Sequence, residues 1–454
     1  MPDTVWALSK QPFQDLKCKM RNPRSQIRNL KCRFRHPQSA IRNALLLLLL
    51  LGTNSFAQTT AVVHLADGRT AQIVCDGAQF DLSDKGTIRG QAGGGRREFP
   101  SQDIWKIEFG SSPVARGSTE QLWLLDGTRL SGQLVGWEPW QRAVVRSDLF
   151  RSVPVWDSAI LALTHGWPPP PRLPATVAGK DVLHTSDGDR RVGRFLRIDA
   201  RSIGFRSELG NLAVERQRVS SLVLDTSKTV EARDAAWALV FANGDRVFTG
   251  SWAIEGGRIR CTICGNQPNA PASLLRRAIH LGPRTEVFSR IQPQQFSMQP
   301  LLEGTRAILV DRGPGNGPLL SGNREYLFGL FLRPNCEMDY ALSGNAEFFL
   351  AELAPASDFG LPIADCGMTN RQPDPGNPQS AIRNPQSAIV RVALAVGDSP
   401  WKSYSIAAGD APLSLAFPLD GARRLRLRVE SANEWGDGAH VLLGEPVLIK
   451  KTKP

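Results

Sequence analysis

Four segments of the chain repeat one pattern, and that pattern limits the possible fold more than any other feature of the sequence. Each segment has an apolar run, a tight turn, a second apolar run containing a glycine, and a closing strand rich in Ile, Val or Leu. The turns are Asp67-Gly68, Asp126-Gly127, Asp187-Gly188 and Asn243-Gly244, spaced by roughly 60 residues. Asp-Gly and Asn-Gly tolerate the positive φ angles of a two-residue hairpin turn, and alternating apolar residues beside the turn place one face inward. The pattern predicts paired β-strands in every segment.

The predicted fold class is all-β, with tandem small β-barrel-like repeats followed by a C-terminal jelly-roll β-sandwich. A chain of 454 residues is long enough for several domains, since single hydrophobic cores stop growing at about 250 residues. The repeats resemble the SH3-like or Sm-like small barrels of secreted bacterial proteins, although a single open sheet or an elongated array of hairpins also fits the pattern. Their expected bounds are 58–110, 121–165, 180–225 and 236–282. The linkers 110–120 and 165–180 are rich in Pro and Gly, so the units need not pack tightly.

The first 57 residues form a basic leader with the features of a secretory signal peptide. They hold ten of the 55 Lys and Arg residues and two of the 43 Asp and Glu residues, so most of the net charge of +12 belongs to them and no nucleic-acid partner is expected. Leucines 45–51 follow Arg42, and Ser55-Phe56-Ala57 offers a cleavage site before Gln58. The apolar run is shorter than the ~20 residues that span a bilayer, which favours cleavage over anchoring. We therefore expect a secreted, periplasmic or cell-envelope protein with no transmembrane segment after cleavage.

A shorter phrase, Asn-Pro-Gln-Ser-Ala-Ile-Arg, recurs in close copies at 36–43 and 377–389. It cannot form a core, because each copy has a proline and a single Ile. The phrase resembles translated repetitive DNA that interrupts unrelated bacterial reading frames. We interpret 365–389 as a disordered insertion in a loop, and Met20 is one alternative start of the protein.

The last third of the chain, 283–454, carries a series of strand motifs in a specific order. These are Gly329, "CEMDYAL" (336–342), "AEFFLAEL" (346–353), Gly397-Asp398 with Trp401 and Ser403, and "PLDGARRLRLRVE" with Gly421, Leu425, Leu427 and Val429. In this order and spacing they resemble the carbohydrate-binding module family called NPCBM, a galactose-binding-like β-sandwich first noticed beside glycosidases. The family's final signature, Asp-His-Ala followed by Trp, is present only in part, as Asp437-Gly438-Ala439-His440 with no Trp after it. The resemblance implies a sandwich and a glycan or cell-surface polysaccharide as partner.

Aromatic and polar residues near the C-terminus are the candidate ligand contacts. A sugar offers an apolar ring face to Trp or Tyr and hydroxyls to Asp and His. The candidates are Trp401, Tyr404, Trp435, Asp437 and His440. Trp435 is expected to be the exposed platform, because it lies in a stretch rich in Gly and Asp. Trp401 is expected to be partly buried, because it follows a strand end. Packing against the sandwich is the alternative role for each aromatic residue.

Catalytic and metal-binding motifs are absent from the sequence. It contains no G-x-S-x-G, H-E-x-x-H or phosphate-loop motif, and its histidines lie in separate units. Cys261-x-x-Cys264 lacks a second pair at zinc-site spacing, so buried or free thiols are expected and no metal or cofactor is assigned. Glycosidase carboxylates have no fixed spacing, so inspection does not exclude them.

Three functions therefore remain open. The first is a secreted, non-catalytic carbohydrate-binding or cell-surface protein of bacterial origin. The second is a structural or protein-interaction array, in which the repeats bind other envelope proteins. The third is an unrecognised hydrolase or an accessory protein of one. The family resemblance favours the first.

Overall fold

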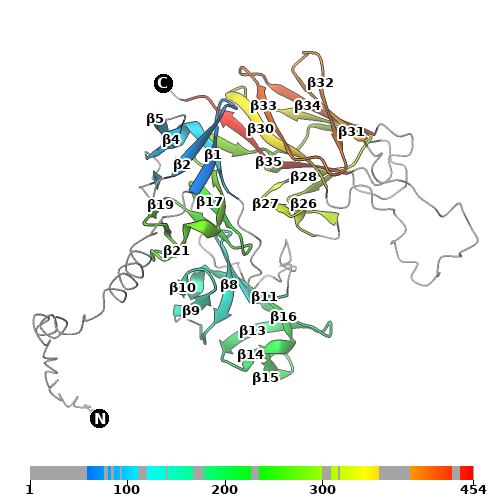
Figure 1. Ribbon diagram of the computed structural model, residues 1–454. Helices are drawn as coiled ribbons and strands as arrows, with labels where there is room; N and C mark the ends of the chain where they lie inside the picture. The colour runs from blue at the N-terminus through cyan, green and yellow to red at the C-terminus, as the bar shows by residue number, and fades with distance from the viewer. Residues whose placement is uncertain are drawn as a thin grey trace, which may run out of the picture. The chain divides into compact units, whose positions relative to one another are not determined.

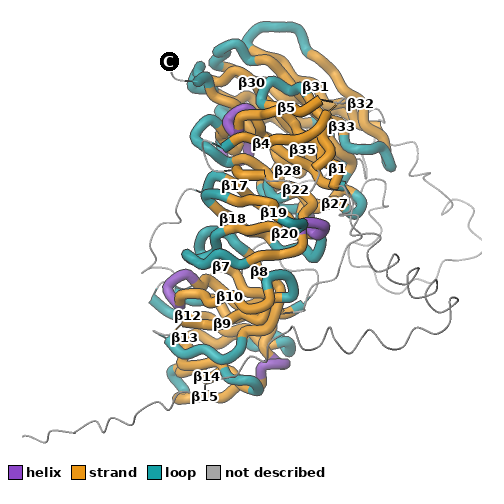
Figure 2. Tube along the Cα trace, turned by 60° about the vertical axis from the view of Figure 1, so that its left-hand side comes forward, coloured by secondary structure: helices purple, strands orange, loops and turns teal. Residues whose placement is uncertain are grey.

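The computed structural model describes residues 59–75, 80–82, 86–92, 95–110, 120–139, 142–166, 177, 179–225, 235–298, 308–314, 317–356, 389–431 and 440–452. Figure 1 shows the strands of these residues, and Figure 2 shows that only short helical turns accompany them. No helix among the described residues is long and apolar enough to cross a membrane. The all-β prediction is confirmed.

The four repeats form strands β1 to β22. The first repeat contains β1 (Thr59–Leu65), β2 (Thr70–Cys75), β3 (Phe80–Leu82), β4 (Thr87–Ala92), β5 (Gly95–Pro100) and β6 (Ile104–Phe109). The second contains β7 (Glu120–Leu124), β8 (Arg129–Leu134), β9 (Arg142–Ser147), β10 (Arg151–Trp156) and β11 (Ile160–His165). The third contains β12 (Asp181–Thr185), β13 (Arg190–Ile198), β14 (Ser202–Ser207), β15 (Gly210–Glu215) and β16 (Val219–Val223). The fourth contains β17 (Trp237–Phe241), β18 (Arg246–Thr249), β19 (Trp252–Glu255), β20 (Arg258–Cys261), β21 (Asn269–Pro271) and β22 (Leu275–His280).

The repeats share one plan of strand pairing. In each, the first strand pairs with both the second and the closing strand, as β7 does with β8 and β11. A three-residue 3₁₀ turn precedes every closing strand, namely η3 (Ser101–Asp103), η4 (Asp157–Ala159), η5 (Arg216–Arg218) and η6 (Ala272–Leu274). The resemblance to SH3-like or Sm-like barrels stays a prediction.

The hairpin turns differ in type from the prediction. The amide of Leu65 donates to the carbonyl of Arg69, and the amide of Gly68 donates to that of Leu65. Gly68 has a φ of +82°, whereas Asp67 is not in the positive-φ region. This is a three-residue loop in which a type I turn ends in a glycine bulge, and the other three turns make the same hydrogen bonds. Asp is favoured before the glycine because its carboxylate accepts a backbone amide two residues later, at 3.0 Å from Asp67 to Arg69.

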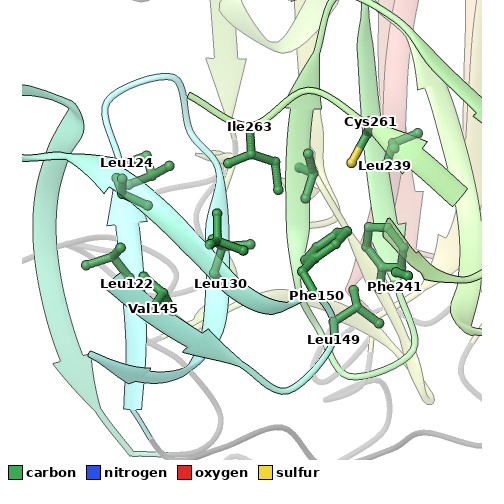
Figure 3. Close-up of a cluster of buried hydrophobic side chains, with 14 of the residues drawn as sticks. Leu122, Leu124, Leu130, Val145, Leu149, Phe150, Leu239, Phe241, Cys261 and Ile263 are labelled. Carbon is green, nitrogen blue, oxygen red and sulfur yellow. The ribbon is translucent and has the colours of Figure 1, made fainter. Parts of the chain in front are cut away.

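The linkers do not require the units to pack tightly, but in the structure the repeats are paired with one another. Closing strands pair across units, β11 with β16 and β6 with β22, while β3 pairs with β19 and β8 with β18. The repeats are therefore joined by hydrogen bonds in the order third, second, fourth, first. Figure 3 shows the apolar core where the second and fourth repeats meet, and there Phe150 packs edge-on against Phe241 at 5.6 Å.

The C-terminal part is a β-sandwich, as predicted. One sheet has the order β25 (Ile308–Val310), β28 (Gly329–Leu332), β35 (Val441–Lys450), β30 (Ala346–Pro355) and β33 (Leu413–Pro418), with β23 (Thr285–Val287) paired to β35. The other has the order β24 (Gln295–Met298), β29 (Cys336–Ala341), β34 (Arg424–Ser431), β31 (Ile389–Val396) and β32 (Lys402–Ala407). A further 3₁₀ turn, η7 (Phe288–Arg290), and the hairpin of β26 (Leu319–Ser321) and β27 (Arg324–Tyr326) complete it.

The core of the sandwich lies between the two sheets, because apolar residues alternate along the inward faces. Leu425, Leu427 and Val429 on β34 are each at most 1% exposed. They belong to the motif that carries the family resemblance, so that motif forms the central strand of one sheet. The leader, both linkers between repeats apart from their ends, and residues 365–388 of the insertion lie outside the described residues.

Candidate functional site

Charged side chains are buried where the first repeat meets the sandwich. Lys106 on β6 is fully buried and pairs with Glu352 on β30. Its ammonium nitrogen also lies 3.1 Å from Glu108, and Arg324 from β27 pairs with both glutamates. Burial is the main cause that lowers the pKa of Lys106, to about 8. Lys106 and Glu352 are buried, whereas the side chains of Glu108 and Arg324 are 25% and 28% exposed. The charges are paired within the protein, where removal of one partner would leave a buried charge uncompensated.

A second buried pair joins the fourth repeat to the sandwich. Arg277 on β22 donates to Glu445 at 2.6 Å, and Glu445 is fully buried. Glu445 has a φ of +50° at a bulge in β35, where the register with β30 shifts. A bulge re-aims the side chain that it carries. Beside it the ring of Tyr326 lies against Gly444, where a Cβ would overlap the ring.

Trp401 is the predicted contact that the structure places on an open face. It follows the β31–β32 turn and is half-buried. The guanidinium groups of Arg426 and Arg428 lie 4.8 and 4.5 Å from the centroid of its ring. Both arginines alternate along β34 with the buried core residues, so this is the outer face of the sheet. The indole is thus held in place by two cations.

Acidic side chains balance the charge of this face. Arg428 donates to Glu337 at 2.9 Å, and Arg424 pairs with Asp339. Hydrogen-bond donors and acceptors therefore lie on either side of Trp401 along β29 and β34. An aromatic ring among paired charges suits a neutral, hydroxyl-rich molecule better than an ion.

Tyr404 and His440, the other predicted contacts among the described residues, do not join Trp401. Tyr404 is partly buried and packs against the sandwich core, with the ammonium of Lys402 5.6 Å from its ring centroid. The ring of His440 lies 4.9 Å from that of Phe331, which belongs to the apolar cluster beneath the β26–β27 hairpin on the other sheet. Trp401 and His440 are therefore on opposite outer faces of a sandwich about 10 Å thick between its sheets. Trp435 and Asp437 lie outside the described residues.

A cleft of about 560 Å³ lies between the first repeat and the sandwich. Phe99 and Phe348 contribute apolar surface to it, and its charged lining consists of Asp67, Arg69, Arg97, Glu98, Asp103, Arg284 and Glu347. Arg284 already pairs with Asp103 at 3.4 Å and with Glu347 at 3.1 Å. Most of these charges are thus used within the protein, which leaves the cleft little net attraction for an ion.

Cys261 and Cys264 lie in apolar surroundings of the kind that keep a thiol unreactive. Cys261 belongs to the core of the repeats, where burial raises the pKa of its thiol to about 12. Burial also raises the pKa of the Cys264 thiol to about 11, with a further contribution from the charge of Asp126. Both thiols are free, and the described residues contain no group of three potential metal ligands.

Trp156, the aromatic residue at the end of β10, is not among the contacts predicted from the sequence. Its side chain is 47% exposed, and the guanidinium of Arg142 lies 3.7 Å from its ring centroid. The sequence contains an indication of this exposure, because successive side chains of a strand point to opposite faces. Val153 and Val155 are fully buried, and Trp156 lies on the face opposite to theirs. A residue on that face must point outward.

Comparisons with known proteins give remote structural likenesses only. No family model and no curated protein matches the chain. One solved structure that it resembles holds the second CBM51 module and the INT domain of Clostridium perfringens ZmpB, with 11% identity and a TM-score of 0.28, over 42% of this chain and 36% of that one. A CBM51 module from Clostridium perfringens GH95 in complex with methyl-galactose gives 14% identity and a TM-score of 0.27, over 36% of this chain and 99% of that one.

A third likeness is to the tandem CBM51 modules of the family 98 glycoside hydrolase from Streptococcus pneumoniae, with 13% identity and a TM-score of 0.27. It covers 60% of this chain and 88% of that one. The chain spans about a third of the length of the first of these structures. The fold described above is therefore established by the strand pairing of the chain itself.

Proposed function

We propose that the chain is an exported, non-catalytic protein whose C-terminal sandwich binds a neutral carbohydrate on the outer face that carries Trp401. The observation that carries the proposal is the half-exposed indole, fixed by Arg426 and Arg428. A fixed aromatic ring loses little freedom on binding and offers its uncovered surface to the apolar face of a sugar ring.

The paired charges beside the indole support a neutral ligand. Glu337 would accept hydrogen bonds from sugar hydroxyls, and the arginines would donate them, whereas Asp339 is buried and serves to hold Arg424. The order of the strand motifs, which resembles a carbohydrate-binding family, supports the same ligand class. His440 would contribute only to a separate site at the other face.

A glycan array probed with the full chain tests this function. We expect binding of at least one neutral glycan, and Trp401→Ala should weaken it by roughly tenfold or more without changing the unfolding temperature, since a binding residue at a partly exposed position affects affinity more than stability. Trp156→Ala is the matched control for the neutral glycans of the array, because it removes an exposed indole from another surface. If the wild-type chain binds no glycan, or if Trp401→Ala binds normally, Trp401 has no such role and an interaction array becomes the better interpretation.

A further inference from the structure

The outer face of β8, β9 and β10 in the second repeat combines an aromatic ring, an apolar stripe and two free cations. The register aligns Val144 with Pro154, and the amide of Val135 donates to the carbonyl of Val144. These three side chains form the stripe across the sheet, and Val135 is 45% exposed. Trp156 and Arg142, which are directly opposite each other, lie at one side of the stripe.

The polar residues on this face are all cationic or neutral. Arg146 stands opposite Gln133 and Ser152 at the other side of the stripe. Among the described residues, neither Arg142 nor Arg146 pairs with a carboxylate, and both are exposed. They lie four residues apart on one strand, a separation of about 13 Å along its axis. Two cations at a fixed spacing therefore have no internal counter-charge.

Comparison of the four repeats shows that the fold does not require these residues. The position just before the 3₁₀ turn is Pro100, Trp156, Glu215 and Pro271 in the four repeats. Its cross-strand partner is Thr87, Arg142, Ser202 and Arg258. A tryptophan stacked with an arginine is therefore peculiar to the second repeat, and it leaves apolar surface in water at a position where the other repeats place Pro or Glu.

The first repeat offers a further contrast. There Arg89, on the strand equivalent to β9, pairs across the sheet with Glu98 at 2.9 Å. In the second repeat the corresponding pair is Val144 and Pro154. The second repeat thus has an apolar pair where the first has an ion pair, and its two arginines stand at the neighbouring positions, two residues to either side of Val144.

We propose that this face of the second repeat binds an acidic polysaccharide, with carboxylates of the polymer on Arg142 and Arg146 and a sugar ring against Trp156 and the apolar stripe. The stack with the indole holds the guanidinium of Arg142 flat and leaves its N–H groups free at the edge. A carboxylate can then accept two parallel hydrogen bonds from it. This surface is distinct from the Trp401 face and binds independently of it.

Two other polyanions fit the geometry less well. An anionic membrane would require the apolar residues to penetrate the surface, but Val135, Val144 and Pro154 lie across the sheet between Arg142 with Trp156 on one side and Arg146 with Gln133 and Ser152 on the other. A single nucleic-acid strand would require several stacking aromatic rings. Among the described residues, this face carries one such ring, that of Trp156.

The test uses the full chain with polygalacturonate as probe and dextran as the uncharged control. We expect binding to polygalacturonate that weakens with added salt, and no binding to dextran. The double variant Arg142→Gln/Arg146→Gln should bind about tenfold more weakly or worse, and Trp156→Ala should also bind more weakly. Arg258→Gln is the matched control at the equivalent position of the fourth repeat and should bind as the wild type does.

Several outcomes would overturn the proposal. These are no binding by the wild type, full binding by the double arginine variant, or equally tight binding of single-stranded DNA or phosphatidylserine vesicles. Because both arginines are exposed, the double variant keeps its fold and the test stands even if Trp156→Ala loses stability. Trp401→Ala should retain polygalacturonate binding, so failure of this proposal and failure of the neutral-glycan proposal are distinguishable.

Discussion

At the scale of single residues, the buried charged groups decide where the parts of the chain meet. Asp245 is an example, because it ends the hairpin turn of the fourth repeat and is fully buried against the second. Its carboxylate accepts the backbone amide of Ser131 on β8 at 2.6 Å. Burial raises its pKa to about 6, against the opposing effect of hydrogen bonds and of the charge of Arg129.

This raised pKa predicts a pH dependence of stability. The folded state binds the proton of Asp245 more tightly than the unfolded state does, so its contribution to stability is greatest below about pH 4 and is lost as the pH rises through about 6. The loss is of the order of 3 kcal/mol. Urea unfolding measured at pH 4.5 and at pH 7 should show that the free energy of unfolding falls less with rising pH for Asp245→Asn than for the wild type. An identical pH dependence in the variant would contradict the assignment.

At the scale of elements, the four turns are the same in hydrogen bonding but differ in their surroundings. A Cβ at Gly68 would overlap Ala416 on β33, so this turn is docked against the sandwich. Gly188 has a similar φ of +92°, and nothing lies within 4 Å of its Cβ position. One turn type therefore serves both as a free loop and as a contact.

This difference predicts unequal costs for the same substitution. Gly188→Ala should cost only the left-handed backbone strain, about 1–2 kcal/mol. Gly68→Ala adds a steric clash against β33 and should lower the free energy of unfolding by more than that, by a further 1–3 kcal/mol as for overpacking. Denaturant unfolding of both variants would measure the difference in their free energies of unfolding. Equal destabilisation would mean that the first turn is not docked as described.

Local features of the fold could be predicted from sequence, and the pairing between distant parts could not. Asp67-Gly68 and its counterparts determine their turns, and the parity of Leu425, Leu427 and Val429 determines which face of β34 is buried. The pairing of β6 with β22 depends on backbone groups, which are alike in every strand and leave no sequence signal. For the same reason the sequence could not show that Trp401 and His440 face away from each other.

At the scale of the whole molecule, the order of the repeats in space differs from their order in the chain. Among the described strands, the third repeat pairs with the second alone, whereas the fourth pairs with both the second and the first. The fourth repeat also carries Arg277, whose partner Glu445 belongs to the sandwich. It is the central unit, and the third is terminal.

Excision of whole repeats should reveal this order. Replacing residues 180–224, most of the third repeat, by a short Gly-Ser linker should leave the rest of the chain folded but less stable. The costs are a new edge at β11, the loss of the pair between Arg216 and the buried Glu120, and the exposure of Trp137, which stacks on Phe195. Replacing 237–280, the fourth repeat, should abolish cooperative unfolding, because three other parts lose their partners. Thermal unfolding followed by circular dichroism would compare the cooperativity and the stability of the two shortened chains. A mild effect of the second excision would contradict the central position of the fourth repeat.

The pairing of β3 and β6 with strands of the fourth repeat has a consequence for biosynthesis. The first repeat leaves the ribosome long before β19 and β22 exist, so its partner edges stay open while two further repeats are made. The nascent chain therefore carries unpaired strand edges until residues 252–280 have been synthesised. The contact between the first and fourth repeats closes a loop that contains the second and third repeats.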